Sequence, residues 1–488
     1  MTLRIERPSR LDEDRGFHPI RTQLASIHNA MNPNLSVVSS RREFLKTTGR
    51  LAAVSALAGT ALPHVHAAGN DLIQVALIGC GGRGSGAAVD ALNTKSGPTK
   101  LVAMADAYEH RLRNSYESLT SKSLGAKMEV PEERRFIGFD AYKKAMDCLK
   151  PGDVAIFATP PAFRWVHFQY ALAKRLNVFM EKPVTVDGPT SKRMLQLAEE
   201  ATAKNLKAAV GLMSRHARPL QELQKRIQDG ELGDIILMRG YRMQGGGGLG
   251  RKPANLTELD FQVQRFHSFI WASGGNYSDN YIHILDHLGW MKNAWPVKAQ
   301  ALGGRHYKQS VNGTPYVDQN FDTYSVEYTF ADGAKMFFDG RHITGCQDIY
   351  SSYVHGSKGM AIASRSGDCG APATMFKGQN PTRSNMLWES TNRSNPYQNE
   401  WDDLIDAIRN DQPYNEVKRG VEASLATSMG RMAAHTGQEI TYEDMLNCEH
   451  EMAPGLDQVT SNSPAPVQPD ANGRYPVPEP GINRNREY

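Results

Sequence analysis

A glycine-rich turn between two apolar segments constrains the fold of this chain more than any other feature of its sequence. Residues 73–78 are apolar and rich in β-branched side chains, as in a short buried strand, and residues 87–92 are alanine-rich, as in a helix. Between them, residues 79–84 follow the pattern G-x-G-x-x-G. A strand, this turn and a helix in succession predict the first unit of a parallel, doubly wound sheet of the Rossmann type.

The residues of this turn have distinct parts in binding a dinucleotide. The first glycine permits a tight turn, and the second lets the backbone approach the pyrophosphate. The helix that follows offers free N–H groups and a partial positive charge at its N-terminus. The predicted cofactor-binding residues of the turn are Gly79, Gly81, Gly82, Arg83 and Gly84.

A carboxylate follows the next apolar run at the spacing that dinucleotide sites use. Residues 101–105 are apolar and lead into Asp106, about 20 residues after Gly84. A carboxylate at this place can accept hydrogen bonds from the ribose hydroxyls of adenosine, and it would repel a 2′-phosphate. The sequence therefore predicts NAD as the cofactor and makes NADP the less favoured alternative.

Further alternation of strands and helices continues the predicted sheet. Residues 154–158 and 178–180 read as buried strands, and residues 165–175 and 190–204 as helices. Ligands of doubly wound sheets lie beyond the carboxyl ends of the strands. The residues directly after these two strands include Thr159, Pro160, Glu181 and Lys182. We expect them to converge with the glycine turn and Asp106 on one crevice.

The second half of the chain has a different pattern. Residues 235–244 alternate as a half-buried strand does, and residues 324–330 and 335–338 flank a hairpin turn signal. Residues 401–408 and 420–436 read as amphipathic helices. This half therefore predicts an α+β domain with a large, mostly antiparallel open sheet. The predicted parts are a leader at residues 1–68, an NAD-binding Rossmann domain at 69–213, a substrate and oligomerisation domain at 214–450, and an extended or disordered tail at 451–488.

The leader has the features of an export signal. Residues 40–46 read S-R-R-E-F-L-K, and an apolar run at residues 51–62 and the small residues Ala67 and Ala68 follow. This order is typical of a twin-arginine signal peptide, and the apolar run is too short for a stable membrane anchor. We therefore predict export through the twin-arginine machinery to the periplasm or beyond. Because Met31 directly precedes the signal, translation from Met31 rather than Met1 is the expected start.

Composition excludes several other classes of protein. The chain carries 56 Lys and Arg against 52 Asp and Glu, and its net charge of +4 comes from the leader. The body has no basic excess of the kind that drives binding to nucleic acid. The five cysteines are scattered, with no spacing that suggests a zinc site.

These motifs, taken together and in this order, resemble the Gfo/Idh/MocA family, which includes glucose–fructose oxidoreductase and inositol dehydrogenase. The resemblance covers roughly residues 72–445. The motifs that carry it are residues 79–84, Ala158-Thr159-Pro160, Glu181-Lys182-Pro183, residues 211–215, Gly274-Gly275 and Asp279-x-x-x-His283-x-x-Asp286. The final section, from residues 395–397 to 442–444, resembles the twin-arginine-exported branch of that family.

The resemblance implies roles for three side chains. Lys182 would reach the nicotinamide and the reacting hydroxyl, where a cation stabilises a developing alkoxide. His283 would act as the acid/base, and Asp279 would assist it or contact the substrate. The two share one face if the surrounding segment is helical, and a nearby carboxylate raises the pKa of an imidazole. Tyr281 stands where many members of the family have glycine, so the identity of the substrate does not carry over.

Two further features of the sequence allow other interpretations. Residues 283–287 match an inverted zinc-peptidase motif with Asp in place of Glu, but a third ligand is not evident and the Rossmann half would be unexplained, so no metal is predicted. Arg215 and His216 follow a strand end and are expected either to line the substrate side or to lie on the surface.

The predicted function is NAD-dependent oxidation or reduction of a sugar or polyol hydroxyl by hydride transfer. Because a free nicotinamide pool is not expected outside the cytoplasm, the cofactor should be tightly bound and recycled. The alternatives are a glycoside hydrolase or epimerase that works by transient oxidation, and a non-catalytic sugar-binding protein. The family further implies a homo-oligomer, a dimer or a tetramer.

Overall fold

The computed structural model describes residues 71–488 with the exception of residues 123, 311 and 368–371. The predicted leader, with its twin-arginine motif and both candidate start residues, lies outside the described residues.

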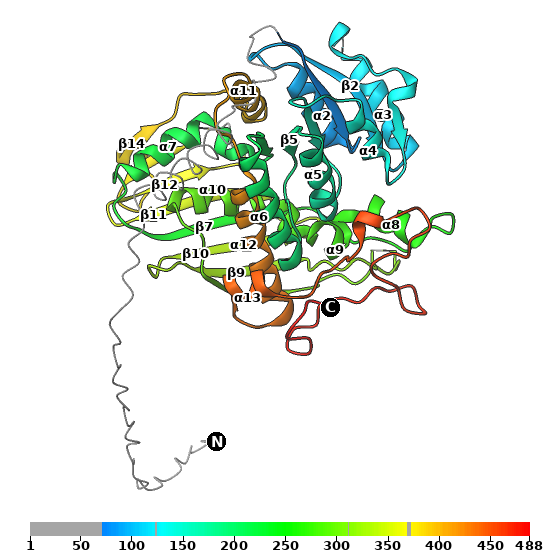
Figure 1. The fold of residues 1–488 in the computed structure, drawn as a ribbon. Coiled ribbons are helices and arrows are strands. Elements are labelled where there is room, and N and C mark those ends of the chain that lie inside the picture. The colour runs from blue at the N-terminus through cyan, green and yellow to red at the C-terminus, as the bar shows by residue number, and fades with distance from the viewer. Residues whose placement is uncertain (1–70, 123, 311, 368–371) are drawn as a thin grey trace, which may run out of the picture. The chain divides into compact units, whose positions relative to one another are not determined.

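The first half of the described chain forms a six-stranded, all-parallel sheet with the order β3-β2-β1-β4-β5-β6. Its strands are β1 (Ile73–Ile78), β2 (Thr99–Asp106), β3 (Arg135–Ile137), β4 (Val154–Phe157), β5 (Asn177–Met180) and β6 (Ala208–Val210). The helices between them are α2 (Gly82–Leu92), α3 (Glu109–Thr120), α4 (Ala141–Asp147), α5 (Arg164–Ala173) and α6 (Gly188–Ala203). The predicted doubly wound Rossmann sheet is confirmed (Figure 1).

The strands of this sheet are continuous apolar runs because helices cover both faces. Every residue of β4 and β5 is buried. The helix α2 lies close to β1, since a Cβ on Gly84 would come within 2.0 Å of the carbonyl oxygen of Gly79. Only glycine fits at this contact, so the last glycine of the G-x-G-x-x-G pattern allows the helix to pack closely against the strand.

The second half forms a nine-stranded sheet with the order β14-β13-β12-β11-β7-β10-β9-β8-β15. Its strands are β7 (Ile235–Gln244), β8 (Lys298–Gly304), β9 (Thr323–Thr329), β10 (Lys335–His342), β11 (Ile349–Gly356), β12 (Gly359–Ser364), β13 (Thr374–Lys377), β14 (Met386–Glu389) and β15 (Ile440–Thr441). All neighbouring pairs are antiparallel except β7 and β10, which run parallel. The predicted large, mostly antiparallel sheet is therefore confirmed.

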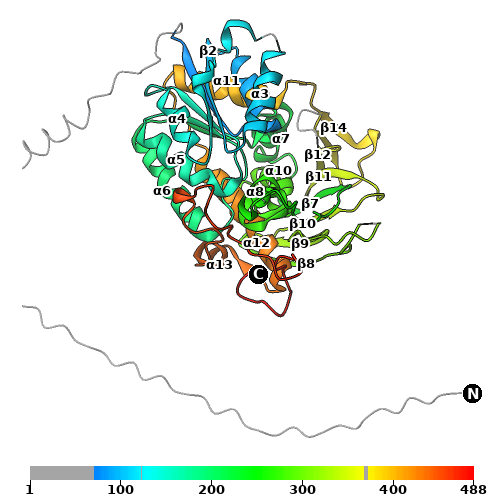
Figure 2. The same ribbon diagram turned by 90° about the vertical axis from the view of Figure 1, so that its right-hand side faces the viewer.

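Helices cover one face of this sheet, as Figure 2 shows for α10 and α12. The helices of this half are α7 (Arg218–Gln228), α8 (Glu258–Gln264), α9 (Ile270–Ser273), α10 (Gly275–Lys292), α11 (Pro396–Arg409), α12 (Val417–Thr436) and α13 (Tyr442–Asn447). Two glycines let α10 approach the sheet. A Cβ on Gly240 would lie 2.6 Å from Ile284, and one on Gly340 would lie 2.3 Å from the ring of Tyr281. No helix of the described part is long and apolar enough to cross a membrane.

Side chains from both halves share one hydrophobic core. The ring of Phe163, at the start of α5, packs edge-on against Trp271 of α9, with centroids 6.3 Å apart. The helix α11 belongs to the second half by sequence but packs on the Rossmann sheet, where Trp401 stacks on Phe179 of β5 at 4.5 Å. These contacts hold the carboxyl ends of the parallel strands close to α8, α9 and α10.

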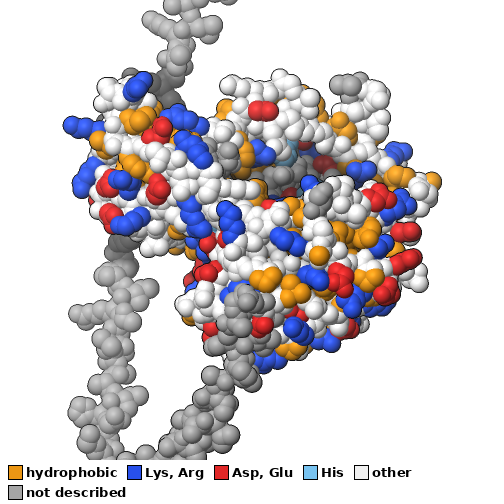
Figure 3. Space-filling view, turned by 90° about the horizontal axis from the view of Figure 1, so that it is seen from above, with side chains coloured by type: hydrophobic (Ala, Val, Ile, Leu, Met, Phe, Trp, Pro, Cys, Tyr) orange, Lys and Arg blue, Asp and Glu red, His pale blue; other side chains and the backbone are white. Residues whose placement is uncertain are grey.

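The segment after α13 runs along the surface and inserts single side chains into the body. All its residues are described, and its only helical element is the short 3-10 turn η7 (Leu456–Gln458). Val467 and Tyr475 are buried, and so is Glu487, the residue before the C-terminus. In Figure 3 acidic, basic and apolar side chains are interspersed on the visible face, with no continuous basic patch among its described residues.

Candidate functional site

A cleft lies at the carboxyl ends of β1, β2, β4 and β5, closed on one side by α8 and the segment that follows it. The residues that line it are Gly79, Gly81, Gly82, Arg83, Gly84, Asp106, Ala107, Tyr108, Arg111, Ala158, Thr159, Pro160, Pro161, Arg164, Glu181, Lys182, Val263, Phe266, His267 and Asp279. All the predicted cofactor-binding residues are among them, and so is Asp279. His283 is not part of this lining, and it lies one helical turn beyond Asp279 in α10.

The glycine turn leaves room for a pyrophosphate. Gly79 has a φ of +96°, and a Cβ there would lie 2.6 Å from the carbonyl carbon of Ala158, so the turn itself requires glycine. A Cβ on Gly82 would meet nothing within 4 Å, and one on Gly81 would meet only Arg111, at 3.9 Å. The backbone therefore faces open space at the start of α2, where phosphate oxygens can reach its N–H groups. This geometry fits NAD.

Asp106 ends β2 and is held by the backbone. Its Oδ2 accepts a hydrogen bond from the N–H of Cys80 at 2.7 Å, and its Oδ1 accepts one from the N–H of Tyr108 at 3.0 Å. Each carboxylate oxygen has a further lone pair. The side chain is therefore fixed in the cleft with acceptor capacity left for a ribose hydroxyl.

Arg83 of the turn is engaged by protein carboxylates. Its Nε donates to Oε1 of Glu181 at 2.5 Å, and its Nη2 donates to Oε1 of Glu400 at 3.3 Å. Glu181 and Glu400 have side chains only 8% and 1% exposed. Arg83 thus links the phosphate-binding turn to the residue directly before Lys182 and to α11.

Lys182 and Asp279 meet at the inner end of the cleft. The Nζ of Lys182 donates to the backbone oxygen of Asp279 at 2.6 Å and lies 3.6 Å from its Oδ1. His267 Nδ1 lies 2.8 Å from the other carboxylate oxygen, Oδ2. Burial would raise the pKa of Asp279, but Lys182 and His267 outweigh it and hold the pKa well below its ordinary value. The carboxyl group is therefore ionised.

His283 is a neutral imidazole with free hydrogen-bonding capacity. Burial, and then the positive charge of Lys182, lower its pKa well below the ordinary value, although Asp279 acts in the opposite direction. Its Nδ1 is sealed within the protein and has no hydrogen-bond partner in the described part, whereas Nε2 is not sealed. An imidazole in this state can accept a proton at neutral pH.

Arg164 adds a second buried cation beside Lys182. It begins α5, is 1% exposed and donates from Nη1 to Oγ1 of Thr159 at 3.2 Å. Its Nε has no partner among the described residues. Burial lowers the pKa of Arg164 to about 10, with Glu181 and Asp279 opposing the shift. The guanidinium remains charged at neutral pH and can donate to a ligand in the cleft.

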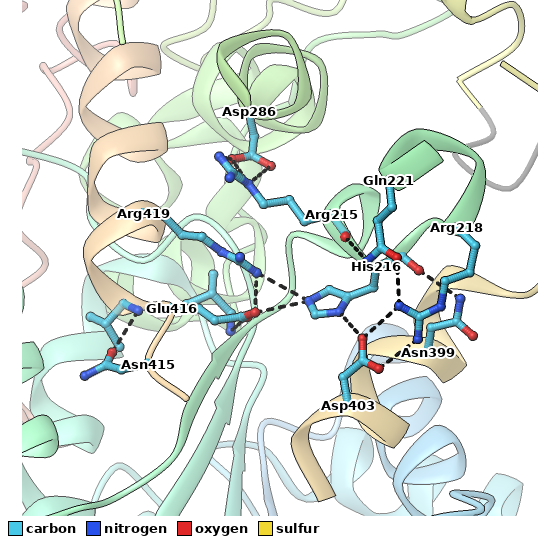
Figure 4. A network of polar contacts seen from close by, with 12 residues as sticks. Arg215, His216, Arg218, Gln221, Asp286, Asn399, Asp403, Asn415, Glu416 and Arg419 are labelled. Carbon is cyan, nitrogen blue, oxygen red and sulfur yellow. Dashed lines mark hydrogen bonds and ion pairs between the residues drawn. The ribbon is translucent and has the colours of Figure 1, made fainter. Parts of the chain in front are cut away.

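Figure 4 shows a polar network that connects the end of the Rossmann sheet to α10, α11 and α12. Arg215 Nε lies 3.0 Å from each carboxylate oxygen of Asp286, and its Nη2 lies 2.8 Å from Oδ1. His216 lies between Asp403, 2.7 Å from Nδ1, and Glu416, 3.2 Å from Nε2. The surface position considered for Arg215 and His216 is therefore wrong, since both bind carboxylates of neighbouring helices.

The charges of this network determine the protonation state of His216. Burial would lower its pKa, but Glu416 and Asp403 outweigh it and raise the pKa to about 9. The imidazole is therefore a cation at neutral pH. His287 of the H-x-x-D-H motif bonds through Nε2 to Oγ of Ser352 at 2.7 Å, and no group of three potential metal ligands occurs among the described residues.

Sequence reasoning did not single out His267, Arg164 or Arg242. His267 lies in an irregular turn, η5 (Phe266–Ser268), where no periodicity marks a position. Arg164 could have been found by extending the strand-end rule into the first turn of the next helix. Arg242 lies inside β7, and only the register of the neighbouring strands shows which face it takes.

Part of this chain is similar in sequence to a family of NAD-binding proteins. Residues 73–211 match the family model Gfo/Idh/MocA, described as an oxidoreductase family with an NAD-binding Rossmann fold. The chain is 22% identical over 204 residues to inositol 2-dehydrogenase of Corynebacterium glutamicum, over 41% of this chain and 54% of that protein. The matched region thus spans about half the length of this curated relative.

Solved structures share the fold over a larger part of the chain. Myo-inositol 2-dehydrogenase of Lactobacillus plantarum has a TM-score of 0.55 and 20% identity, over 76% of this chain and 99% of the other. Levoglucosan dehydrogenase in complex with NADH and levoglucosan has a TM-score of 0.58 and 15% identity, over 76% and 100%. At these identities the likeness establishes the fold. Together with the family match and the glycine turn, it shows that residues 73–211 form a Rossmann domain similar to the NAD-binding domain of Gfo/Idh/MocA oxidoreductases.

Proposed function

We propose that this chain is an NAD-dependent oxidoreductase that acts on a hydroxyl group of a sugar or polyol. The observation that carries the proposal is the contact of Lys182 with an ionised Asp279 at the inner end of the dinucleotide cleft, with a neutral His283 one helical turn further along α10. The names of the relatives support the substrate class, because inositol 2-dehydrogenase and levoglucosan dehydrogenase are among them.

The side chains at the inner end of the cleft divide the work of such a reaction. NAD, when bound, supplies the acceptor for the two electrons removed from a carbinol carbon. Lys182 has three N–H donors, and the one bonded to Asp279 leaves two for the substrate oxygen. Its charge stabilises negative charge that develops on that oxygen. Nε2 of His283 accepts the hydroxyl proton, and Asp279 stabilises the resulting imidazolium.

The predicted export bears on how the cofactor is used. The twin-arginine motif at residues 40–46 supports transport of a folded chain with its dinucleotide already bound. Outside the cytoplasm the dinucleotide would stay bound and be recycled, either by a second substrate or by returning the electrons to the first. Exposed Leu302 and Phe337 on the second sheet support a homo-oligomer that meets through this sheet.

The test uses the purified chain with the dinucleotide it retains. Aldoses and polyols are added, and the absorbance band of NADH and the products are followed. Lys182→Met and His283→Asn should keep the dinucleotide and lose at least about 100-fold in turnover. Lys174→Met, at the exposed lysine that directly follows α5, is the matched control and should behave as the wild type.

Three outcomes separate the candidate functions. Net oxidation or reduction of a polyol or aldose supports the proposal. Release of sugar from glycosides, or epimerisation, with no net change at the NADH band would instead indicate transient oxidation. A chain that holds NAD and alters none of these compounds would contradict both enzymatic functions and leave sugar binding.

A further inference from the structure

One arginine of the second sheet projects toward α10 and has no counterion among the described residues. Arg242 of β7 pairs across the sheet with Gly340 of β10 and Tyr350 of β11. Residues directly opposite each other on neighbouring strands project from the same face. Because Gly340 meets Tyr281 of α10, Arg242 and Tyr350 lie on the face that α10 covers.

The position of Arg242 along this face brings it next to His283. Ile284 of α10 lies over Gly240, and Tyr281 lies over Gly340, so α10 runs antiparallel to β7 and parallel to β11. His287 of α10 bonds to Ser352 of β11 at 2.7 Å. His283 lies one turn earlier along α10, and Tyr350 lies two residues earlier along β11, so these two also come close together. Burial, Lys182 and His287 lower the pKa of His283, and the charge of Arg242 adds a smaller shift in the same direction.

The guanidinium of Arg242 stacks on an aromatic ring and has no carboxylate partner in the part of the chain that the structure describes. Its Cζ lies 3.9 Å from the centroid of the Tyr350 ring, a cation–π contact that fixes the plane of the group. Its Nε is sealed from solvent and has no hydrogen-bond partner among residues 71–488 as far as these are described. Within the described part of the chain, Arg242 forms no ion pair with a carboxylate. A partly buried charge without a partner is costly to the folded protein, which points to a ligand that completes it.

Two other cations that contact α10 have their own carboxylates, and Arg164 lies in the lining of the dinucleotide cleft. Lys182 lies 3.6 Å from Asp279, and Arg215 bonds to both oxygens of Asp286. A substrate with no charge would leave Arg242 without a counterion among the described residues. A substrate with a carboxylate would supply one.

We propose that Arg242 binds the carboxylate of an acidic sugar, a uronic or aldonic acid, and so sets the specificity of the site. The inference rests on the proposed function. A planar guanidinium held against an aromatic ring presents its remaining N–H groups in the geometry that a carboxylate accepts. The hydroxyl to be oxidised would then lie between this anchor and Lys182.

The test compares pairs of sugars that differ only at C6, where the acid has a carboxylate in place of the hydroxymethyl group. The pairs are galactose with galacturonate and glucose with glucuronate. Binding to the purified chain with its dinucleotide is measured by calorimetry, and turnover by chromatography of the products. The acid should bind about 10- to 100-fold more tightly than its neutral partner, the range of a charge-assisted hydrogen bond. Arg242→Met should abolish this preference, chiefly through KM, and Arg242→Lys should restore part of it.

Arg239 provides the matched control. It lies three residues earlier on β7 and on the opposite face, stacked on Tyr353 at 5.1 Å and bonded to His355. Arg239→Met should keep the preference for the acid. Because Arg242→Met removes an unpaired charge, its melting temperature without sugar should equal or exceed that of the wild type.

The outcomes distinguish this inference from the proposed function. Equal or weaker binding of the acids, or an unchanged preference in Arg242→Met, overturns the carboxylate site even when the chain oxidises neutral sugars. Binding of the acids through Arg242 without any turnover supports the site and contradicts the oxidoreductase. Tighter binding of sugar phosphates than of uronates also overturns the assignment to a carboxylate.

Discussion

Replacing Glu487 by alanine tests whether the segment after α13 stabilises the folded protein through a buried ion pair next to α10. The carboxylate of Glu487 is 2% exposed and accepts hydrogen bonds from Arg431 Nε and Nη2, each at 2.8 Å, and lies 2.6 Å from His435 Nδ1. Arg431 in turn donates to the oxygen of Gly274 and to Oγ of Ser278, at the start of α10. The same guanidinium donates to the oxygen of Val186, four residues after Lys182.

The size of the effect follows from the charge that remains. Glu487→Ala leaves the fully buried Arg431 without its only carboxylate among the described residues. Removing one partner of a buried ion pair costs about 3–5 kcal/mol. With an unfolding entropy of roughly 2.1 cal/mol/K per residue and roughly 400 ordered residues, the melting temperature should fall by about 4–6 °C.

The pH dependence identifies the charge as the cause. Burial would raise the pKa of Glu487, but Arg431 and His435 lower it to about 2, below an unfolded value of about 4.3. A group whose pKa falls on folding stabilises the protein above its unfolded pKa. The difference in stability between the wild type and Glu487→Ala should therefore be constant above about pH 5 and shrink as the pH falls toward 2.

Thermal and urea unfolding of the full chain measure this difference. Glu479→Ala, at an exposed glutamate of the same segment, is the matched control and should melt with the wild type. Glu487→Gln, which keeps the shape without the charge, should lie between them. If Glu487→Ala melts within a degree of Glu479→Ala, the end of the chain does not stabilise the folded protein through this ion pair.

Three further predictions concern the network and the cleft. Folding raises the pKa of His216 to about 9 from about 6.5, so this group contributes roughly 3 kcal/mol to the free energy of unfolding below about pH 6.5 and loses that contribution as the pH rises through 9. In urea unfolding at both pH values, the stability of His216→Gln should approach that of the wild type at high pH. A difference that stays constant with pH would contradict this. Gly84→Ala should destabilise the apo-protein, since its Cβ would lie 2.0 Å from a backbone oxygen. Gly82→Ala should leave the melting temperature unchanged and weaken NAD binding, because its Cβ would meet nothing within 4 Å. Equal losses of stability in both variants would refute the assignment of the open space to the pyrophosphate. Asp106→Ser should weaken NAD binding and reduce the preference for NAD over NADP in calorimetry, and an unchanged ratio of the two affinities would refute the role of the carboxylate.

Most of the Rossmann half could be predicted because its signals are local. Gly79, Thr159 and Lys182 each follow the end of a strand. Because the carboxyl ends of parallel strands lie at one edge of the sheet, these residues come together independently of how the helices between them pack. The positions of Asp279 and His283 depended on the family resemblance, since their helical spacing alone does not say which side chains they meet. The contact of Asp279 with Lys182 joins residues 97 positions apart.

The rest of the site depends on contacts that no short segment contains. Arg242 faces α10 because Gly240 and Gly340 let that helix lie close to the sheet. Trp401, in the second half of the sequence, packs on the first sheet. Glu487 lies in a segment without periodicity, and its significance comes from Arg431 on α12. Sheet register and the path of an irregular segment decide these three positions.

The affinity of the cofactor-free full chain for NAD tests the central claim most directly. Isothermal titration with NAD and NADP should show one NAD bound per chain, with NADP bound more weakly, because the turn of residues 79–84 is open to a pyrophosphate and the carboxylate of Asp106 lines the same cleft. Failure of a correctly folded chain to bind either dinucleotide would contradict the assignment of the cleft and every role derived from it.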